Sequence, residues 1–349
     1  MAAIGIIGTG NISGTHARAA RAAGLEVAAV YGRDPSRTAA FTAMHGGSGY
    51  SDLDAFLRHP GLQFVAIGTP SALHAEHGIA AARRGLHVLV EKPIDVSANR
   101  ADALIAACAE AEVRLGVFFQ ERFAPGILAL RDIIGRGVLG RPILVSARVR
   151  WCRPPSYYAS STWRGTAELD GGGVVVNQGI HTLDTLLHLL GPVASVHARS
   201  ATALHAIATE DTVVATLEFA TGALGTFECT TSAHPGYPRR IEITGTEGTA
   251  IIDGTALIAL DLRSPTDARP DLPAGGDSRA GTAAVDADGH RLVFEDFLAA
   301  IASGRPPRCD GSEGRRSIAL VEALYESARS GIPAAPDDAP PLRTRAANS

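Results

Sequence analysis

The sequence predicts an α/β protein with an N-terminal domain built on a parallel sheet and a C-terminal α+β domain built on a large, open, mainly antiparallel sheet. Short β-rich runs alternate with helical patterns over about the first 120 residues, as in parallel sheets with crossover helices. From Val193 to about Leu262, strands follow one another across short glycine turns, which indicates antiparallel pairing. The 349 residues are also more than one hydrophobic core commonly holds.

The first domain is expected over residues 1–122. An apolar strand at Ile4–Ile7 runs into a glycine turn and a helix that ends near Ala23. Pro35 suits the first turn of a later helix, because its φ angle is helical and its missing N–H needs no partner there. The remaining strands are predicted at Val27–Val30, Phe64–Ile67, His87–Val90 and Arg114–Phe119, and the remaining helices at His74–Arg84 and Ala98–Ala111.

The second domain is expected over residues 123–331, and residues 332–349 as a poorly ordered tail rich in Pro, Ala and Asp. Residues 264–289 are rich in Gly, Asp, Ala and Pro, which indicates a surface excursion. Strands are predicted at Pro142–Arg150, Thr212–Phe219, Leu224–Thr231, Arg240–Gly245, Ala250–Asp253 and Leu257–Leu262, and helices at Ala124–Gly135, before Leu190, at Val293–Ser303 and at Ser312–Arg329.

Composition excludes several classes of protein. Hydrophobic residues make up 46% of the chain, enough for a core, and the formal charge of -4 argues against a basic surface that binds nucleic acid. No stretch approaches the ~20 apolar residues of a membrane helix, and the first residues lack the pattern of an export signal. We therefore expect a cytoplasmic protein. The cysteines have no paired spacing, so neither a disulfide framework nor a metal site is predicted; they are Cys108, Cys152, Cys229 and Cys309.

Lys92 is the only lysine in the chain, whereas the other 31 of its 32 basic residues are arginines. The pKa of a lysine amine can be lowered until the amine exchanges a proton near neutrality, but an arginine stays protonated. Composition alone is equally compatible with the chance survival of one lysine. Lys92 is therefore a candidate for a position at which arginine fails.

A glycine turn follows the first strand and opens the first helix. Such a turn lets the backbone approach a pyrophosphate, and the helix N-terminus supplies free N–H groups and a positive potential. A purely structural glycine turn is the alternative, but the strand–turn–helix context favours dinucleotide binding. The predicted contacts are Gly8, Thr9, Gly10, Asn11 and Ile12.

The end of the second strand distinguishes NAD from NADP, because an acidic side chain there holds the ribose 2′-hydroxyl of NAD. Gly32 occupies the place where that acid is expected. Arg33 and Arg37 can pair with a 2′-phosphate, whereas Asp34 can serve NAD instead. We expect NAD or NADP as the cofactor, with a preference for NADP.

Later strand ends carry side chains suited to a ligand, because open α/β sheets bind ligands at the carboxyl ends of their strands. Glu91-Lys92-Pro93 follows one such strand, and its lysine is expected beside the nicotinamide. Whether the Lys92–Pro93 bond is cis is left open. The other cofactor contacts predicted here are Thr69, Pro70, His74, Glu91 and Gln120, and Arg122 is predicted to bind substrate.

His181 lies on a predicted helix with Asn177 one turn before it, so both side chains can point into the same cleft. A histidine suits general acid–base work near neutral pH, although a lone one is more often a satisfied core residue. Asp184 shares its helix face, either to orient the imidazole ring or as a surface carboxylate. His188 is interpreted as structural.

These motifs together resemble the Gfo/Idh/MocA oxidoreductase family: the Gly8–Ile12 turn, Glu91-Lys92-Pro93, and Gly171-Gly172-Gly173 leading to Asn177 and His181. The likeness extends to about residue 331. It implies a Rossmann domain, homodimers or homotetramers formed through the C-terminal sheet, and NAD(P)-dependent chemistry on sugars or cyclitols. By resemblance, Lys92 and His181 are the catalytic lysine and histidine.

Position 177 departs from the pattern, because many members carry Asp there and Asn cannot ionise. Some sugar-nucleotide oxidising members are similar in carrying Asn. Tyr157-Tyr158 and Trp163-Arg164-Gly165 also resemble that branch, with packing at the domain interface as an equal alternative. The resemblance assigns Trp163 and Arg164 to the cofactor, and Tyr158, Asn177, Gln178 and His181 to the substrate.

The predicted reaction interconverts a secondary hydroxyl and a ketone on a small-molecule carbohydrate, which is a sugar, a sugar acid, a glycoside or a sugar nucleotide, with C3 of a pyranose as one position. His181 accepts the hydroxyl proton while Lys92 hydrogen-bonds the oxygen or relays the proton, and Asn177 completes the catalytic set. The alternatives are an inositol or cyclitol dehydrogenase and a non-catalytic dinucleotide sensor. The joint presence of Lys92 and His181 argues against the sensor.

Overall fold

The computed structural model describes residues 2–264, 287–337 and 339, which form two compact units. The first unit comprises residues 1–120 and 284–315, and the second comprises residues 121–283 and 316–349. The prediction that residues 123–331 form the second domain is therefore wrong for helix α9 (Ala287–Ser303), because this helix belongs to the first unit. This helix packs on α1 (Asn11–Ala22) and buries Phe294 and Phe297 in the first unit. An amphipathic pattern predicts such a helix but does not say which sheet it covers.

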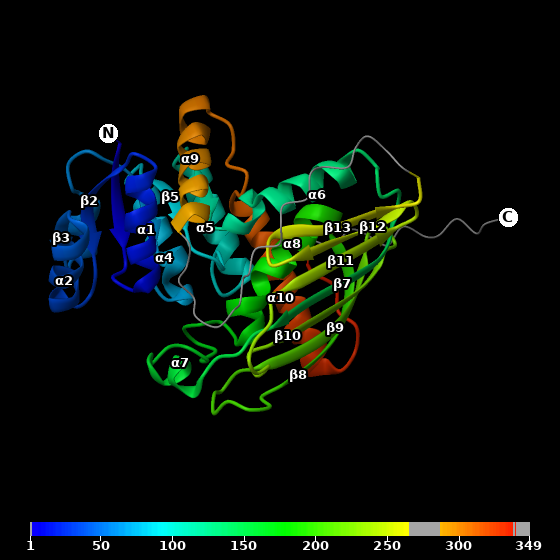
Figure 1. Cartoon of the computed structure of the whole chain (residues 1–349). Helices are drawn as coiled ribbons and strands as arrows, with labels where there is room; N and C mark the ends of the chain where they lie inside the picture. Colours follow the sequence, from blue (N-terminus) through cyan, green and yellow to red (C-terminus); the bar gives the residue numbers. More distant parts are fainter. Residues whose placement is uncertain (1, 265–286, 338, 340–349) are drawn as a thin grey trace. The chain divides into compact units, whose positions relative to one another are not determined.

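The first unit contains a parallel sheet in the order β3-β2-β1-β4-β5-β6, which confirms the predicted Rossmann-type fold (Figure 1). The strand order reverses between β1 and β4, and ligands bind open α/β sheets at such a switch point. The strands are β1 (Ala3–Ile7), β2 (Glu26–Tyr31), β3 (Ser48–Tyr50), β4 (Leu62–Ile67), β5 (His87–Val90) and β6 (Leu115–Val117).

Helices cover both faces of this sheet. The central strands are apolar and buried on both sides, and such strands need a helix layer on each face. Asp34 and Ser97 cap the N-termini of α2 and α5 with side-chain oxygens, which explains where these helices begin. Besides α1 and α9, the helices are α2 (Pro35–His45), α3 (Leu53–Leu57), α4 (His74–Ala82) and α5 (Ala98–Glu110), with 3₁₀ turns at η1 (Ser71–Leu73) and η2 (Gln120–Phe123).

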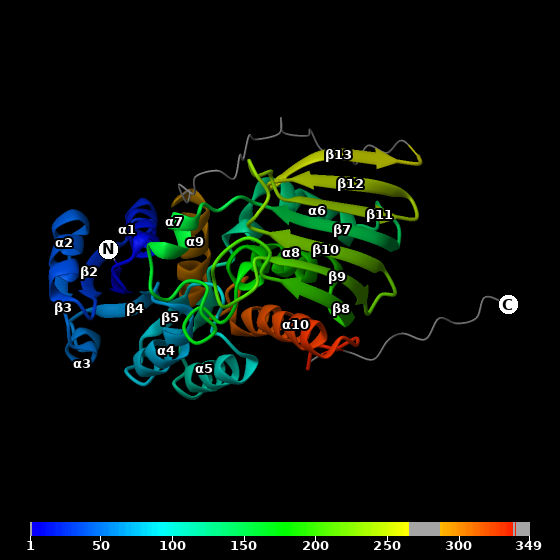
Figure 2. The ribbon, with the colours of Figure 1, turned by 90° about the horizontal axis from the view of Figure 1, so that it is seen from below.

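The second unit contains a seven-stranded sheet in the order β13-β12-β11-β7-β10-β9-β8 (Figure 2). Among the strands that the structure describes in this unit, only β10 and β7 pair in parallel, so the predicted mainly antiparallel sheet is confirmed. The strands are β7 (Pro142–Arg150), β8 (Val193–Ala201), β9 (Thr212–Phe219), β10 (Leu224–Thr230), β11 (Arg240–Gly245), β12 (Gly248–Asp253) and β13 (Ala256–Leu262).

Helices pack on one face of this sheet. Along β7, Val145, Ala147 and Val149 are buried toward α8, and α6 covers β12 and β13. The helices are α6 (Pro125–Gly135), α7 (Pro155–Ala159), a π turn η3 (Val175–Gly179) that continues into α8 (Ile180–Leu190), and α10 (Gly311–Ser330), within which the division into units falls.

The predicted tail begins in an ordered segment. Ala334 pairs with Val196 of β8 through two backbone hydrogen bonds of 2.8 and 2.9 Å, so the expectation of poor order is wrong for this part. Residues 340–349 and most of the expected excursion, residues 265–286, lie outside the described residues. In the described parts of the chain, no helix is both long and apolar enough to cross a membrane.

Candidate functional site

The glycine turn of the first unit fits a dinucleotide pyrophosphate. Gly8 has a φ of +112°, and a Cβ there would lie 2.8 Å from the carbonyl oxygen of Gly68, so only glycine suits this position. Gly10 is the N-cap of α1 and offers no side-chain cap, while a Cβ on it would meet nothing within 4 Å. No side chain of the described residues caps the first N–H groups of α1, and uncapped N–H groups at a helix N-terminus are the groups that bind phosphates. Thr9, Asn11 and Ile12 complete this partly exposed turn.

Gly32, which follows β2, has no room for a side chain. A Cβ there would lie 2.5 Å from Oγ1 of Thr38 and 2.7 Å from Cγ2 of Thr9. The Thr38 hydroxyl is held in place, because its oxygen lies 2.9 Å from the carbonyl oxygen of Asp34 and 3.2 Å from that of Gly32 itself. The acidic residue that commonly selects NAD at this position is thus absent for a steric reason.

Asp34 is engaged in the fold at the start of α2. Its Oδ1 accepts hydrogen bonds from the backbone N–H groups of Ser36 at 2.9 Å and Arg37 at 3.2 Å, which makes it the N-cap. The side chains of Arg33 and Arg37 are exposed beside it. The sequence analysis names Asp34 as a residue that can serve NAD. In the structure, its carboxylate oxygen Oδ1 is already bonded to the N-terminus of α2.

His74 is an interior side chain of the first unit. The side chain is 1% exposed, with Nδ1 2.8 Å from the carbonyl oxygen of Pro93 and Nε2 3.0 Å from that of Thr69. The predicted cofactor contact is therefore wrong, and His74 instead links the segments after β4 and β5. Burial lowers its pKa. Thr69 and Pro70 themselves stay partly exposed after β4.

Glu91 is also an interior residue, which corrects its assignment to the cofactor. Its Oε1 lies 2.9 Å from Nε2 of His16 and 3.1 Å from Nε2 of His290, and its Oε2 accepts the backbone N–H of Lys92 at 3.0 Å. Burial acts to raise the pKa of Glu91, but the two histidine donors hold it well below its usual range. The buried carboxylate thus anchors the backbone of Lys92.

The three donor atoms of this cluster lie within 4.8 Å of one another, close enough to hold a metal ion. Histidines that bind metals almost always donate their second ring N–H to a partner. Nδ1 of His16 and Nδ1 of His290 are buried with no hydrogen-bond partner in the described part of the chain. Imidazoles that donate from Nε2 to Glu91 account for this arrangement, so we assign the cluster to positioning Lys92.

Lys92 is partly exposed where β5 ends, and the Lys92–Pro93 bond is cis. Gln120 is half-buried at the end of the first segment of this unit. The first unit thus brings the glycine turn, Lys92 and the segment after β4 to the carboxyl edge of one sheet, as predicted.

In the second unit, Asn177 and Gln178 lie in the π turn and His181 in the first turn of α8. Single π turns are rare and are frequently found at functional sites. The amide Nδ2 of Asn177 donates to Oδ2 of Asp170 at 2.7 Å, and the same oxygen accepts the backbone N–H of Gly165 at 2.9 Å. A buried carboxylate therefore holds the side chain that replaces the expected acid. His181 is 8% exposed.

Glu210 holds the segment that leads into this helix. Its carboxylate accepts the backbone N–H groups of Gly173 at 3.1 Å and Val175 at 3.1 Å, and the hydroxyl of Tyr325 at 2.9 Å. Burial raises the pKa of Glu210, and these hydrogen bonds oppose that shift.

The same contacts explain why glycines precede the π turn. A Cβ on Gly173 would lie 1.9 Å from the carbonyl oxygen of Glu210, and one on Gly172 would lie 2.1 Å from the Tyr325 hydroxyl. The glycines are thus required for this close packing around Glu210.

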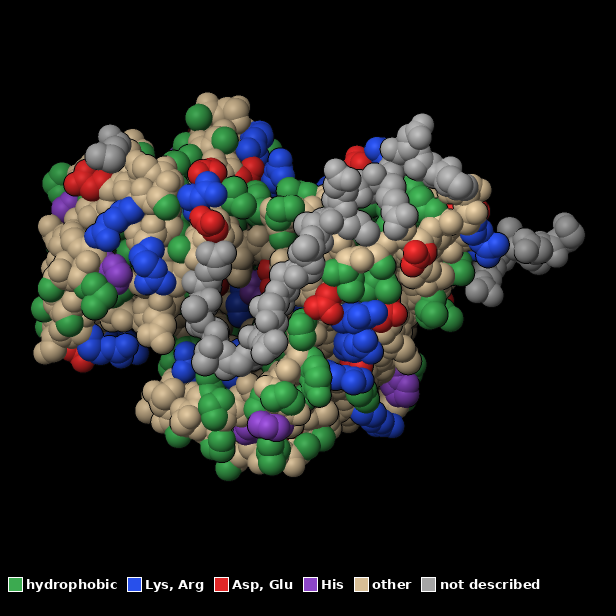
Figure 3. All heavy atoms as spheres, in the orientation of Figure 1, with side chains coloured by type: hydrophobic (Ala, Val, Ile, Leu, Met, Phe, Trp, Pro, Cys, Tyr) green, Lys and Arg blue, Asp and Glu red, His purple; other side chains and the backbone are tan. Residues whose placement is uncertain are grey.

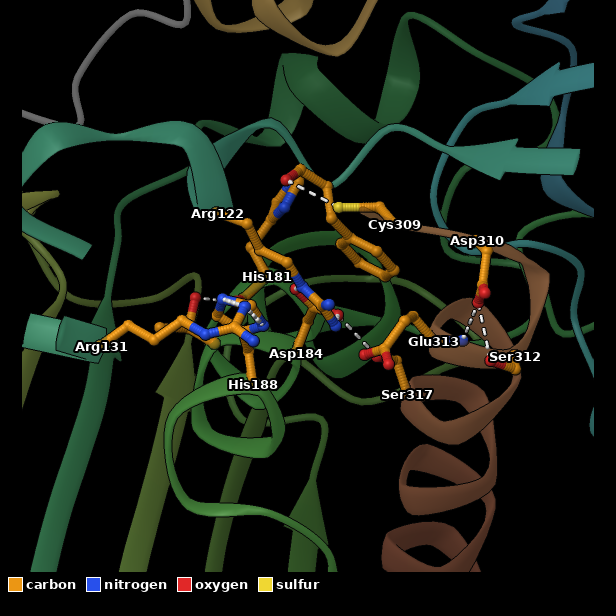
Figure 4. A network of polar contacts seen from close by, with 12 residues as sticks. Arg122, Arg131, His181, Asp184, His188, Cys309, Asp310, Ser312, Glu313 and Ser317 are labelled. Atoms are coloured by element: carbon orange, nitrogen blue, oxygen red, sulfur yellow. Dashed lines mark hydrogen bonds and ion pairs between the residues drawn. The ribbon is translucent and has the colours of Figure 1, made fainter. Parts of the chain in front are cut away.

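Arg122 and Asp184 form a buried ion pair (Figure 4). Nε and Nη2 of Arg122 lie 2.7 and 2.5 Å from the two carboxylate oxygens of Asp184, which also accepts the Ser317 hydroxyl at 3.0 Å. Arg122 is 3% exposed and Asp184 is 1% exposed. The predicted substrate contact of Arg122 is therefore wrong, and Asp184 is a buried partner of Arg122 and Ser317 instead of a surface carboxylate. His188 lies 2.7 Å from Arg131, in keeping with a structural role.

Sequence reasoning missed Glu210 and His290, because each acts across a long separation in sequence, and it also missed Asp170, which acts on the nearby Gly165 and Asn177. Glu210 stands outside any motif, His290 lies on a helix assigned to the other domain, and Asp170 directly precedes the three adjacent glycines. The three adjacent glycines before the π turn were the one available signal for Glu210, since they indicate a close approach of other atoms.

Comparison with known proteins identifies the family. Residues 2–119 match the model of an oxidoreductase family with an NAD-binding Rossmann fold, and residues 127–251 match the GFO/IDH/MocA C-terminal domain. The structure resembles the WlbA dehydrogenase from Bordetella pertussis, crystallised with NADH and UDP-GlcNAcA, with a TM-score of 0.89, 32% identity and 98% of each chain covered.

Two curated relatives extend over nearly the whole chain. D-xylose 1-dehydrogenase (NADP(+)) 2 of Haloferax volcanii is 29% identical over 94% of this chain and 97% of its own length. Inositol 2-dehydrogenase of Rhizobium meliloti is 28% identical over 93% of this chain and 96% of its own length.

Proposed function

Because the chain belongs to the Gfo/Idh/MocA family of oxidoreductases, we propose that it interconverts a secondary hydroxyl group and a ketone on a carbohydrate. It is an oxidoreductase that acts on CH–OH groups with a nicotinamide cofactor, as its relatives are. The proposed substrate is a sugar, a sugar acid, a glycoside or a sugar nucleotide, with C3 of a pyranose as one position of oxidation. A cytoplasmic location stays a prediction.

The observation that carries the proposal is the placement of Lys92. The one lysine of the chain follows β5, at the sheet edge that also holds the open N-terminus of α1. Its backbone is fixed by Glu91, while its side chain is partly exposed. The N–H groups of α1 and the glycine turn would hold the cofactor pyrophosphate. When bound, the nicotinamide supplies the hydride acceptor.

In the proposed reaction the amine of Lys92 donates a hydrogen bond to the substrate oxygen. It stabilises the alkoxide charge that develops there or passes on the proton. An imidazole nitrogen of His181 accepts the hydroxyl proton as the carbon is oxidised. Asn177, held by Asp170, serves only as a hydrogen-bonding group, because its amide cannot ionise.

A substrate panel tests the proposal. Neutral sugars, glycosides, uronic acids, sugar nucleotides and myo-inositol are each supplied with NAD⁺ and with NADP⁺, and the absorbance of the reduced nicotinamide is followed. We expect at least one carbohydrate to react with kcat/KM of about 10⁴ M⁻¹s⁻¹ or more, as is usual for a physiological substrate. Turnover of myo-inositol alone would establish the cyclitol alternative. Cofactor binding without any turnover would establish the sensor alternative.

We further propose that the protein prefers NADP to NAD, since Gly32 excludes an acid and Arg33 is exposed beside the capped end of α2. Replacing Arg33 with alanine is expected to lower kcat/KM for NADP⁺ by about 10- to 100-fold, the worth of a charge-assisted hydrogen bond. The kcat/KM for NAD⁺ should change less than about threefold, because NAD has no 2′-phosphate. Steady-state kinetics with both cofactors measures this. Equal efficiency of wild type and variant with NADP⁺ would contradict the preference.

The open face of the second unit's sheet supports the proposal of a homodimer or homotetramer. Leu144, Val214 and Leu224 are each at least half exposed. Charged side chains gather over the same strands, where Arg150 lies 2.7 Å from Glu228 (Figure 3). A face that combines apolar residues with both signs of charge can pair with a second copy of itself. Association through this face stays a prediction.

A further inference from the structure

Two buried hydrogen-bond donors in the second unit lack an acceptor. The indole Nε1–H of Trp151 and the Nε–H of Arg153 have no hydrogen-bond partner among the residues that the structure describes. Both groups only donate, because the indole nitrogen has no free lone pair and the guanidinium stays protonated. Buried donors are normally satisfied, so the missing partner is an acceptor from outside these residues. Beside a guanidinium, an anionic acceptor is favoured.

The two donors lie on the same side of one extended segment. The chain continues β7 through backbone hydrogen bonds from Trp151 to the carbonyl of Thr230 at 2.9 Å and from Arg153 to that of Thr231 at 2.8 Å. Residues two apart on an extended chain point the same way. The guanidinium carbon of Arg153 accordingly lies 5.1 Å from the ring centre of Trp151.

A second cation shares this surface. The ring of Tyr157 in α7 lies 5.3 Å from the guanidinium carbon of Arg153 and 4.7 Å from that of Arg164. Within the described ranges, neither guanidinium forms an ion pair with a carboxylate, although Arg164 donates to the Ser160 hydroxyl at 3.3 Å. Two unneutralised charges against one aromatic ring create a positive potential that an anion relieves.

Tyr157 connects these cationic side chains to the π turn that carries the proposed substrate contacts Asn177 and Gln178. Nε2 of Gln178 donates to the hydroxyl of Tyr157 at 3.3 Å, and Gln178 follows Asn177 in the π turn. Tyr158 holds α7 in place, because its hydroxyl lies 3.0 Å from that of Thr231. Any group bound against Tyr157 thus lies next to the helix that carries His181.

We propose that Trp151, Arg153 and Arg164 form an anion subsite for the substrate, so that the carbohydrate carries a carboxylate or a phosphate group. This inference rests on the proposed function and narrows its substrate class. It assigns Arg164 to the substrate, whereas the sequence predicted a cofactor contact. Carboxylate and phosphate share the acceptor oxygens that a guanidinium binds.

Four matched substrates distinguish the two sources of anion. The panel is a neutral pyranose, its uronic acid, the nucleoside diphosphate derivative of the pyranose, and the same derivative of the uronic acid. For wild type we expect kcat/KM to rise with the carboxylate, the diphosphate or both, and the pattern identifies the group that the subsite binds. No preference of wild type for any anionic member over the neutral sugar would overturn the proposal.

Variants then test the named residues. Arg153→Met removes the charge and keeps an unbranched side chain, and we expect it to lower the preference for the anionic over the neutral substrate by about 10- to 100-fold, mainly through KM. Arg153→Lys should recover part of that preference, which a merely structural role would not produce. Arg141→Met, at an exposed arginine of the same unit, is the matched control. An equal loss on all four substrates would contradict the subsite.

A binding measurement keeps this test separate from the proposed function. Titrating the intact protein with UDP and with glucuronate by calorimetry needs no turnover. We expect wild type to bind at least one of them about tenfold or more tightly than Arg153→Met does. If the panel shows no oxidation but wild type still binds the anion more tightly than Arg153→Met does, the proposed reaction is wrong and the proposed anion subsite is supported. Equal binding by both proteins would overturn the subsite.

Discussion

Replacing Lys92 with methionine is expected to lower kcat by at least about 10²-fold and up to about 10⁴-fold, the usual worth of a positioned proton donor or acceptor. Methionine keeps the length of the side chain but cannot donate a hydrogen bond or carry charge. Lys92→Arg is the sharper variant, because a guanidinium keeps the charge but does not release its proton. We expect arginine not to restore the rate. Turnover with the best substrate of the panel gives the measurement.

The cofactor affinity of these variants is the control. Lys92 follows β5, whereas the proposed phosphate-binding groups belong to the turn at Gly8–Ile12, so the Kd for NAD(P) measured by fluorescence should change less than about threefold. Near-normal turnover of Lys92→Met would remove the lysine from the reaction. A full recovery in Lys92→Arg would show that charge alone is needed and that no proton passes through this side chain.

Replacing His181 with alanine is expected to lower kcat by a similar factor, about 10²- to 10⁴-fold, because the substrate hydroxyl loses its proton acceptor. The pH profile adds a readout that a packing defect would not produce. In the direction of alcohol oxidation, a histidine base must be neutral to act, so kcat/KM of wild type falls as the pH decreases. This acid limb should disappear in the variant.

His188→Ala is the matched control for this variant. His188 lies on the same helix but contacts Arg131, so its loss should leave kcat within about threefold of wild type. If His181→Ala keeps both the rate and the acid limb, His181 is the satisfied core histidine that a lone histidine on a helix more often is. In that case Lys92 becomes the immediate base.

The sequence signals for the proposed sites of the first unit are local. A strand, a glycine turn and a helix in sequence predict a phosphate site, and the structure shows why position 8 is glycine, because a Cβ there would meet the backbone of Gly68. Lys92 was identified by its rarity and its place after a strand. Parallel strands bring their carboxyl ends to one edge, so separate segments converge there without further information.

Polar residues buried by partners from distant segments could not be predicted. Arg122 and Glu91 resemble ligand-binding residues in sequence, because both follow a strand. The structure pairs Arg122 with Asp184, 62 positions away, and Glu91 with His290, 199 positions away. A buried charge requires such partners, but a pattern of residue types does not reveal them. A charged residue at a strand end can therefore either face a ligand or pair with another residue inside the fold, and only the tertiary contacts show which of the two it does.

Direct hydride transfer from a carbohydrate is the central claim, and isotope transfer measures it. An active carbohydrate of the panel, deuterated at the carbon that is oxidised, is incubated with the protein and NADP⁺ or NAD⁺, and the reduced cofactor is analysed by mass spectrometry. We predict that each reduced cofactor gains one deuterium, with a ketone at the same carbon of the product. Reduced cofactor that carries no deuterium, or deuterium lost to solvent, would contradict the account.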